Sequence, residues 1–304
     1  MARLKFRSSL VLKMRLRALW LRAIESRRHP GIEIKPFILS GPPRSGTSLL
    51  TALLTRKPNV LVANEPVVVG DPLLARGDPA RLLRGYINSI ARQAVQRGTM
   101  PTKVDRKDPS RPTTDTAHHG SRRRNLPVQI DRDQPLCIGV KHPISFMEFL
   151  RELVEGWPQL KVIVLVRDPV LTIRSWRETT YGWQPGLDDP SKGLWRRMYA
   201  DVPAADSPLA RRAHLWNLLV QRGEKYAASH SSQVTLLRYE SLLADPAATM
   251  RSLFAHIGAA RPDDPIDLSD VHPQQHASYK GFTEDEVRMI QSICGETDRR
   301  TRSA

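Results

Sequence analysis

Cysteine is rare in this sequence: Cys137 and Cys294 are the only two in 304 residues, and they lie far apart. Two cysteines at such a distance indicate neither a disulfide framework nor a zinc site built on thiolates. We therefore expect the chain to work in a reducing compartment, with the cytoplasm as its location.

Long hydrophobic runs are also missing. Basic residues interrupt every apolar stretch of residues 1–30: Lys13, Arg15, Arg17 and Arg22. This interruption excludes a signal-peptide core and a membrane span in that segment. The apolar residues instead fall on one stripe at helical spacing: Leu12, Leu16, Leu19 and Ala23. The segment predicts a basic amphipathic helix, which packs either on its own domain or on a membrane surface as a peripheral contact.

Acidic residues and aromatic residues are scarce as well. The chain has 47 Lys and Arg but 31 Asp and Glu, which gives a formal net charge of +16. Such a surface attracts phosphates, sulfates, nucleic acid or anionic lipid without choosing between them. Aromatic residues make up 6% and do not interleave with the basic ones as a base-stacking surface requires, so we expect no specific nucleic-acid partner. A hydrophobic content of 40% is enough for one domain over residues 31–304.

Short apolar runs alternate with helical patterns along the chain. The predicted buried strands are residues 37–39, 60–62, 137–140, 162–166 and 234–237. The predicted helices are residues 49–54, 146–153, 169–180, 246–257 and 283–293. This alternation predicts an α/β fold, in which a parallel sheet is covered by helices on both faces as a three-layer structure.

Two stretches lack periodicity. Residues 97–135 are rich in Pro, Arg, Asp and Thr and include the run from Ser121 to Arg124, so they predict an irregular insertion or a solvated basic loop. Residues 181–207 predict a second irregular stretch.

Residues 41–48, GPPRSGTS, follow the first predicted strand and have the spacing of a nucleotide-binding P-loop. Thr47 stands where the Walker pattern requires lysine, and the only cation of the loop is Arg44. A strand, a tight loop and a helix N-terminus still offer backbone N–H groups and a positive dipole end to an anion. The loop therefore keeps a phosphate cradle but lacks the lysine that bridges the β- and γ-phosphates of ATP.

This loop closely resembles the 5'-phosphosulfate loop of the sulfotransferase family, whose donor is 3'-phosphoadenosine-5'-phosphosulfate (PAPS). The resemblance covers residues 36–295 and is nearest to the bacterial carbohydrate-type and tyrosylprotein sulfotransferases. It implies a P-loop NTPase-like fold, PAPS-dependent sulfuryl transfer and no required metal. It also implies that Arg44 contacts the transferring sulfuryl group. The residues that would supply N–H and hydroxyl donors are Ser45, Gly46, Thr47 and Ser48.

A second motif is KVIVLVRDPVLTIRSW at residues 161–176. Arg167 ends a predicted buried strand, and Ser175 lies eight residues later on a predicted helix. By resemblance, sulfotransferases hold the 3'-phosphate of the donor with Arg and Ser at this spacing. A bidentate guanidinium suits a phosphate dianion, and a hydroxyl adds a further hydrogen-bond donor.

Sulfuryl transfer requires cations at the leaving oxygen and a base at the acceptor hydroxyl. Arg44 meets the first requirement. Glu65 follows the second predicted strand, at the carboxyl end of the sheet, and by resemblance is the base. Lys141, in GVKHP, resembles the K-x-P element of the family and would add a second cation. His142 is the reserve base, although neighbouring strand residues point to opposite faces, so Lys141 and His142 are not expected to share one site.

Two later segments match the family more weakly. Residues 238–240, RYE, follow a strand, and Tyr239 would pack near the adenine of the donor. Residues 278–281, SYKG, precede the last helix, where Ser278 and Lys280 would add contacts to the donor phosphates. A tyrosine at a strand end more often belongs to the core.

The expected acceptor is a hydroxyl of a carbohydrate or glycolipid, followed by a tyrosine or a small phenol. Two other functions are kept as alternatives. A small-molecule kinase would need the P-loop lysine and an aspartate that holds Mg²⁺. A basic, non-enzymatic protein that binds nucleic acid or membrane would need its basic residues on one face, whereas here they are spread along the chain.

Overall fold

The computed structural model describes residues 31–70, 77–115, 121–178, 193–272 and 279–303. The amphipathic helix expected in residues 1–30 lies outside this set and stays a prediction, as does its contact with a membrane. No helix within the described residues combines the length and the apolar composition that a membrane span requires.

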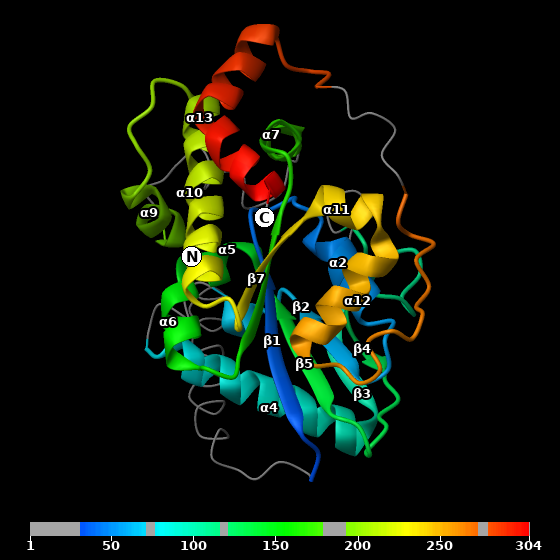
Figure 1. Cartoon of the computed structure of the whole chain (residues 1–304). Coiled ribbons are helices and arrows are strands. Elements are labelled where there is room, and N and C mark those ends of the chain that lie inside the picture. Colours follow the sequence, from blue (N-terminus) through cyan, green and yellow to red (C-terminus); the bar gives the residue numbers. More distant parts are fainter. Residues whose placement is uncertain (1–30, 71–76, 116–120, 179–192, 273–278, 304) are drawn as a thin grey trace, which may run out of the picture.

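Five parallel strands form the central sheet, in the order β2-β5-β1-β6-β7 (Figure 1). Their bounds are β1 Ile34–Ser40, β2 Val60–Asn64, β5 Leu136–Lys141, β6 Lys161–Val166 and β7 Val234–Arg238. Each contains one of the predicted apolar runs, so the predicted parallel α/β sheet is confirmed. The strands end at the same edge, since Asn64 pairs in register with Lys141 and Ser40 pairs with Val164.

Helices cover both faces of the sheet (Figure 1). On one face lie α2 Thr47–Leu54, α11 Tyr239–Ala244 and α12 Pro246–Ile257. On the other lie α4 Pro79–Arg97, α5 Pro143–Glu148, α6 Leu150–Gly156, α7 Pro169–Glu178, α10 Pro208–Ser229 and α13 Glu284–Ser303. Strand β1 divides its apolar side chains between the two layers, because Phe37 and Leu39 belong to the core under α2 while Ile38 belongs to the core under α10. The three-layer prediction is confirmed.

The prediction of an irregular insertion at residues 97–135 is wrong. Strands β3 Thr99–Asp105 and β4 Ser121–Pro127 pair antiparallel there, and β3 lies against β2. Strand β3 buries alternate residues, with Met100, Thr102 and Val104 inward. The hydroxyl of Thr102 donates to the carbonyl of Val62 at 3.1 Å, which fixes the β3–β4 hairpin beside the end of β2.

Two long helices were not anticipated, although both carry start signals in the sequence. Asp78 accepts a hydrogen bond from the backbone of Arg81 and thereby caps α4, and Pro79 is its first residue. Ser207 caps α10 in the same way, followed by Pro208. The predicted helix over residues 146–153 is divided at Phe149 into α5 and α6.

The remaining elements differ from the prediction in extent. The helix expected over residues 169–180 is described as α7 up to Glu178, and the one expected to end at residue 293 continues as α13 to Ser303. Within the stretch predicted to be irregular, residues 181–207, the described part contains α9 Gly193–Ala200. A short 3-10 helix, η1 Val67–Val69, follows β2.

Candidate active site

The loop between β1 and α2 depends on two glycines. Gly41 has a φ of 133°, and a Cβ atom there would lie 2.0 Å from the carbonyl oxygen of Leu165 in β6. Gly46 has a φ of 92° and is the N-cap of α2, with no side-chain hydrogen bond capping that helix among the described residues. The first-turn N–H groups of a helix with such an N-cap are available to an anion.

Tyr239 packs on this loop. A Cβ atom at Gly46 would lie 2.4 Å from the ring of Tyr239, and the guanidinium carbon of Arg167 lies 5.0 Å from the centroid of the same ring. Burial raises the pKa of the Tyr239 hydroxyl. The ring therefore joins the end of β7 to the loop after β1 and to the end of β6.

Replacing Gly46 with alanine is expected to destabilise the fold and weaken donor binding together. The new methyl group would displace the Tyr239 ring and force a strained φ, at a cost of about 1–3 kcal/mol. Urea unfolding measures the first effect and titration with adenosine 3',5'-bisphosphate (PAP) the second. Gly98→Ala is the matched control, because Gly98 has a φ of 60° but its Cβ would meet nothing closer than 3.7 Å. Equal donor affinity in the two variants would contradict the role given to the ring contact.

Two of the described buried polar atoms that lack a hydrogen-bond partner lie at this loop. Among the described residues, the Ser45 hydroxyl and the Arg167 Nε atom are buried and make no hydrogen bond. Thr47 and Ser48, which follow in the loop, are also buried. Buried polar atoms of this kind are normally paired, so a phosphate-bearing ligand fits the donor chemistry that the loop presents.

Arg44 connects the two sequence motifs. It has a φ of 69°, in the left-handed region, and its Nε atom donates to the Ser175 hydroxyl at 2.9 Å. Arg167 donates to the carbonyl oxygen of Arg44 at 3.4 Å. The guanidinium of Arg44 also pairs with Asp115 at 3.2 Å, a contact that no sequence pattern indicated. The structure thus gathers Arg44, Arg167 and Ser175 into one cluster at the ends of β1 and β6.

Glu65 lies directly after β2 with a φ of 46°. Its Oε1 atom accepts a hydrogen bond from Lys141 Nζ at 2.5 Å, and its Oε2 atom accepts one from Lys103 Nζ. Lys141 Nζ also donates to the hydroxyl of Ser48 at 3.3 Å. One buried ammonium group therefore connects the loop after β1 to the carboxylate after β2.

The charges in this cluster shift its pKa values. Burial alone would raise the pKa of Glu65, but the ammonium groups of Lys141 and Lys103 outweigh burial and hold the pKa well below its usual range. Burial lowers the pKa of Lys141, which is 2% exposed, although the Glu65 carboxylate opposes that shift. Glu65 is consequently ionised at neutral pH.

His142 faces other neighbours than Lys141 does. Its Nδ1 atom accepts a hydrogen bond from the backbone of Ser145 at 3.4 Å, which caps α5, and its ring packs edge-on against Phe146. Lys141, the preceding residue, turns to Glu65 instead. The two side chains therefore have different hydrogen-bond partners, but the charge of His142 still helps to lower the pKa of Glu65, so both residues act on that carboxylate.

The segment before α13 contributes little that was predicted. Ser278 lies outside the described residues, and Lys280 is exposed on the turn before α13. The neighbouring Tyr279 instead donates its hydroxyl to Asp168 Oδ2 at 3.3 Å, next to Arg167 in the chain. Tyr279 was not a predicted site residue.

The last turns of α13 are fastened to the ends of β6 and β7. Arg238 is buried and donates to Asp298 Oδ1 at 2.7 Å and to the Thr301 hydroxyl at 2.7 Å. Arg302 lies 3.5 Å from Asp168. These contacts hold Arg238, which precedes Tyr239 in the chain, and Asp168, which follows Arg167.

Lys103 and Arg123 contact Glu65, and neither was predicted from the sequence. Lys103 pairs with the Glu65 carboxylate, and Arg123 donates to the Glu65 carbonyl oxygen. Both come from the β3–β4 hairpin, where they stand opposite each other in register. Since that segment was interpreted as irregular, nothing in the sequence placed either side chain near β2.

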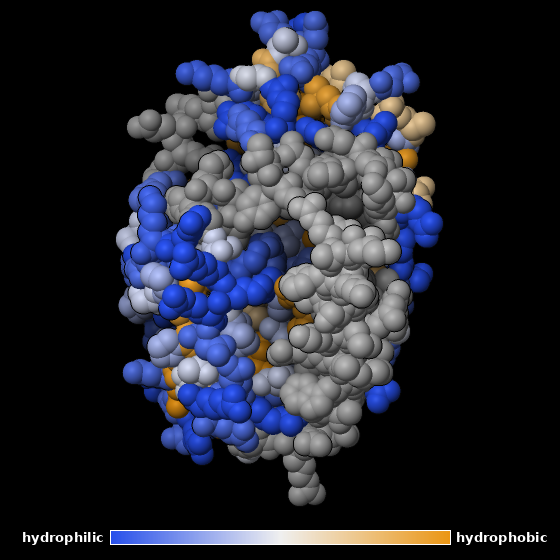
Figure 2. Space-filling model, turned by 180° about the vertical axis from the view of Figure 1, so that it is seen from behind, coloured by the Kyte–Doolittle hydropathy of each residue, from blue (hydrophilic) through white to orange (hydrophobic). Residues whose placement is uncertain are grey.

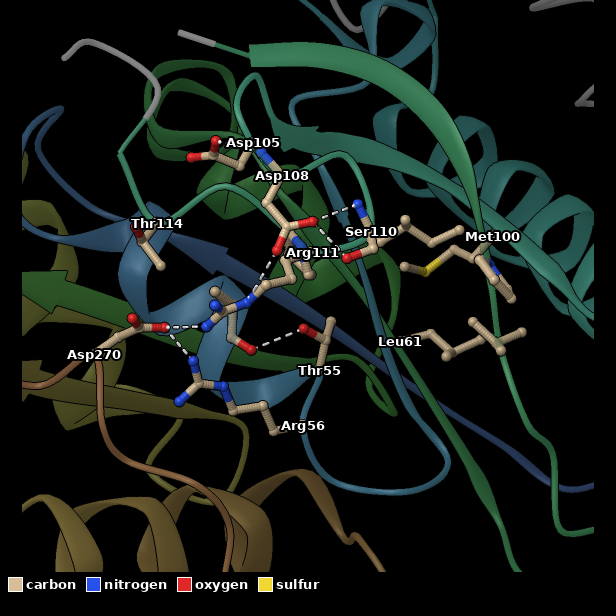
Figure 3. Close-up of a pocket in the computed structure, with 15 residues that line it drawn as sticks. Thr55, Arg56, Leu61, Met100, Asp105, Asp108, Ser110, Arg111, Thr114 and Asp270 are labelled. Atoms are coloured by element: carbon tan, nitrogen blue, oxygen red, sulfur yellow. Dashed lines mark hydrogen bonds and ion pairs between the residues drawn. The ribbon is translucent and has the colours of Figure 1, made fainter. Parts of the chain in front are cut away.

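A cavity of about 410 Å³ lies between the end of α2 and the β3–β4 hairpin (Figure 3). At the polar end of the cavity, Arg56 and Arg111 both pair with the carboxylate of Asp270 (Figure 3). Leu61 and Met100 form part of an apolar wall. None of residues 41–48 lines it, so this cavity is separate from the loop after β1.

A family model described as the sulfotransferase family matches residues 36–263, three quarters of the chain. The matched region contains Arg44, Glu65, Lys141, Arg167 and Tyr239. No curated protein matches the chain.

Several solved structures are similar at low identity. A sulfotransferase from Alicyclobacillus acidocaldarius is 15% identical with a TM-score of 0.48, and the similarity covers 88% of this chain and 94% of that one. The sulfotransferase domain of the Synechococcus PCC 7002 olefin synthase is 15% identical with a TM-score of 0.43, and the similarity covers 88% of this chain and 96% of that domain. Mouse sulfotransferase SULT7A1, complexed with PAP, is 15% identical with a TM-score of 0.41, and the similarity covers 92% of this chain and 88% of the mouse chain.

Proposed function

The chain belongs to the sulfotransferase family, and from this premise we propose that it transfers a sulfuryl group from PAPS to a hydroxyl of a carbohydrate or glycolipid. The observation that carries the proposal is the series of contacts from Ser48 to Lys141 to Glu65. It joins a loop suited to the donor with a carboxylate suited to the acceptor hydroxyl, and both lie at the carboxyl edge of the sheet.

The proposed roles follow from where charge changes during the reaction. The acceptor oxygen forms a bond to sulfur, the bond from sulfur to the 5'-phosphate oxygen breaks, and PAP leaves with the electron pair. Negative charge grows on the leaving oxygen, where Arg44 and Lys141 would stabilise it. The proton of the acceptor hydroxyl would pass to Glu65.

Donor recognition is assigned to the cluster around Arg44. Arg167 and Ser175 would hold the 3'-phosphate, and Tyr239 would pack near the adenine, as the family resemblance implies. The unpaired buried atoms of Ser45 and Arg167 support this assignment, because a phosphate would supply the acceptors that they lack. Ser278 and Lys280 stay predicted contacts.

The surface beside Glu65 supports a hydrophilic acceptor. Viewed from behind, the side of the molecule that carries the β3–β4 hairpin is mostly hydrophilic (Figure 2). Among the described residues, the only exposed large hydrophobic side chains are Val67 and Tyr279, too few to form an apolar patch for a phenol. Sugar hydroxyls suit such a surface better.

Replacing Ser175 with alanine is expected to weaken PAP binding by about tenfold, which corresponds to one hydrogen bond to a charged group. Thermal unfolding with increasing PAP, without added Mg²⁺, measures this, since a ligand of the folded state raises the Tm. Ser229→Ala, on the exposed end of α10, is the control and should bind PAP normally. Stabilisation by ATP with Mg²⁺ but not by PAP would support a kinase-type ligand instead.

Transfer of label from [³⁵S]PAPS to glycans, glycolipids and phenols tests the acceptor. We expect incorporation into the glycan or glycolipid group. Incorporation confined to phenols or tyrosine peptides would contradict the acceptor part of the proposal and leave the sulfotransferase activity intact.

A further inference from the structure

The β3–β4 hairpin supplies Glu65 with more positive charge than the carboxylate requires. Lys141 already neutralises Glu65 through Oε1 and is held in place by Ser48. Lys103 adds a second ammonium group at Oε2, and Arg123 approaches the carbonyl oxygen of the same residue. Two cations thus pair with the carboxylate of Glu65, and a third contacts its carbonyl oxygen.

The strands of the hairpin hold few acidic groups that could balance this charge. Next to Arg123 on β4 stand Arg122 and Arg124, both exposed. Asp105 is the acidic residue of these strands, and it accepts hydrogen bonds from the backbone of Lys107 and Asp108 in the adjoining turn. Arg122 and Arg124 alternate to the opposite face of the strand from Arg123, so the positive charge beside Glu65 comes from the cross-strand pair Lys103 and Arg123.

The surplus charge is costly in the free protein. Burial is the main cause that lowers the pKa of Lys141, and the nearby charge of Lys103 lowers it further. Lys103 itself is 13% exposed, so its charge is only weakly screened by solvent. Like charges around one carboxylate are stabilised when a second anion enters the cluster.

The donor would reach Lys141 at its leaving oxygen, but it does not account for an anion at Lys103 and Arg123. Its phosphates and sulfuryl group are assigned to the loop after β1 and to the Arg44, Arg167 and Ser175 cluster, which lies at the ends of β1 and β6. Lys103 and Arg123 belong to a different element, and they reach Glu65 by its other carboxylate oxygen and its carbonyl oxygen. An anion that pairs with them would arrive with the acceptor.

We propose that the acceptor is an anionic glycan, with a carboxylate or sulfate beside the hydroxyl that receives the sulfuryl group, and that Lys103 and Arg123 bind this anion. The inference rests on the proposed sulfotransfer function. Lys103 would leave Glu65 Oε2 and pair with the acceptor anion instead. The acceptor hydroxyl would then donate its hydrogen bond to Oε2. The hydroxyl proton then passes to Oε2 while the oxygen–sulfur bond forms and PAP departs.

This exchange also improves the base. As long as two ammonium groups hold Glu65, its affinity for a proton is low. When the acceptor anion draws Lys103 away, the pKa of Glu65 rises, and the carboxylate becomes a better acceptor for the hydroxyl proton. Binding of the correct acceptor and activation of the base are thereby coupled.

A pair of matched acceptors tests the proposal. Label transfer from [³⁵S]PAPS by the full chain is measured with p-nitrophenyl β-D-glucuronide and with p-nitrophenyl β-D-glucoside, which has a hydroxymethyl group where the glucuronide has its carboxylate. A second pair is chondroitin and its 4-sulfated form. We expect kcat/KM to be at least about tenfold higher for the more anionic member of at least one pair, as one added charge contact would give.

Variants of Lys103 then test whether the hairpin causes the preference for the more anionic acceptor. Lys103→Ala is expected to reduce the ratio of kcat/KM between the two members to about one, and Lys103→Arg to restore most of it, since the charge is kept. Lys107→Ala removes an exposed charge from the same hairpin turn and should leave the ratio unchanged. A change in folding or base strength alone would affect both members of a pair and not their ratio.

The outcomes separate this inference from the proposed function. Label transfer without preference for the anionic member, or a preference that Lys103→Ala retains, would overturn the anionic acceptor while sulfotransfer stands. Absence of transfer to every member, with PAP still raising the Tm, would also overturn it. If PAP does not bind and no label is transferred to any acceptor, the proposed function itself fails.

Discussion

Replacing Arg44 with alanine is expected to reduce kcat by about 10³-fold, as loss of a cation that stabilises transferring charge typically does. Arg44 is the only cation of the loop after β1, and its Nε atom reaches the Ser175 hydroxyl at 2.9 Å. In the proposed mechanism its removal would take charge stabilisation from the leaving oxygen, and residues 41–48 contain no other cation that could replace it. Label transfer under saturating donor and acceptor measures the effect.

Two further variants define what Arg44 contributes. Arg44→Lys keeps the charge but loses the planar guanidinium fork, so we expect kcat between those of the alanine variant and the native protein. Arg251→Ala is the control, because Arg251 is exposed on α12 and pairs with Asp263. Turnover of Arg44→Ala within about fivefold of the native value would rule out the role at the sulfuryl group, since such a loss is below that of a single positioned donor.

Replacing Glu65 with glutamine is expected to reduce kcat by about 10²–10⁴-fold while PAP affinity stays within about threefold. The amide is nearly the same size and can still accept the hydrogen bond from Lys141, but it cannot take the proton of the acceptor hydroxyl. Single-turnover label transfer and PAP titration separate the two effects. If the variant stayed fully active, His142 would become the candidate base.

Acidification provides a second measurement on the same variant. The pKa of Glu65 is depressed in the folded state, so its stabilising contribution is complete above the unfolded value of 4.5 and is lost as pH falls from there toward the folded pKa. Native protein should therefore lose more free energy of unfolding between pH 5 and pH 3 than Glu65→Gln does. At neutral pH the free energy of unfolding of the variant is lower than that of the native protein, because buried Lys141 has lost its counter-ion.

The sequence was sufficient to predict those parts of the structure that one short segment determines by itself. The loop at residues 41–48 was predicted from its glycines and from the strand before it, and the structure shows why Gly41 and Gly46 are required there. Strands β1, β2, β5 and β6 were predicted because residues that are buried on both faces form continuous apolar runs, and β7, at the edge of the sheet, was predicted from its apolar run although its middle residues are only half-buried.

The β3–β4 hairpin could not be predicted for the opposite reason. Strand β3 contains Pro101 and Lys103 among its seven residues, and β4 exposes three consecutive arginines. Strands of a ribbon at the edge of a domain bury few side chains, so their hydrophobic alternation is weak. Lys103 and Arg123 reach Glu65 only through the pairing of these strands, a tertiary effect that leaves no local pattern.

The fastening of α13 to the strand ends has a consequence for the order in which the protein assembles. Tyr239 lies on the loop at Gly46, and its neighbour Arg238 is fixed by Asp298 and Thr301, which follow it in the chain by 60 and 63 residues. The ribosome must therefore have synthesised the chain as far as α13 before this corner can close, and contacts so distant in sequence form late in folding. Affinity for the donor nucleotide would then mark the final stage of maturation, which makes PAP a reporter of fully folded protein in newly made material.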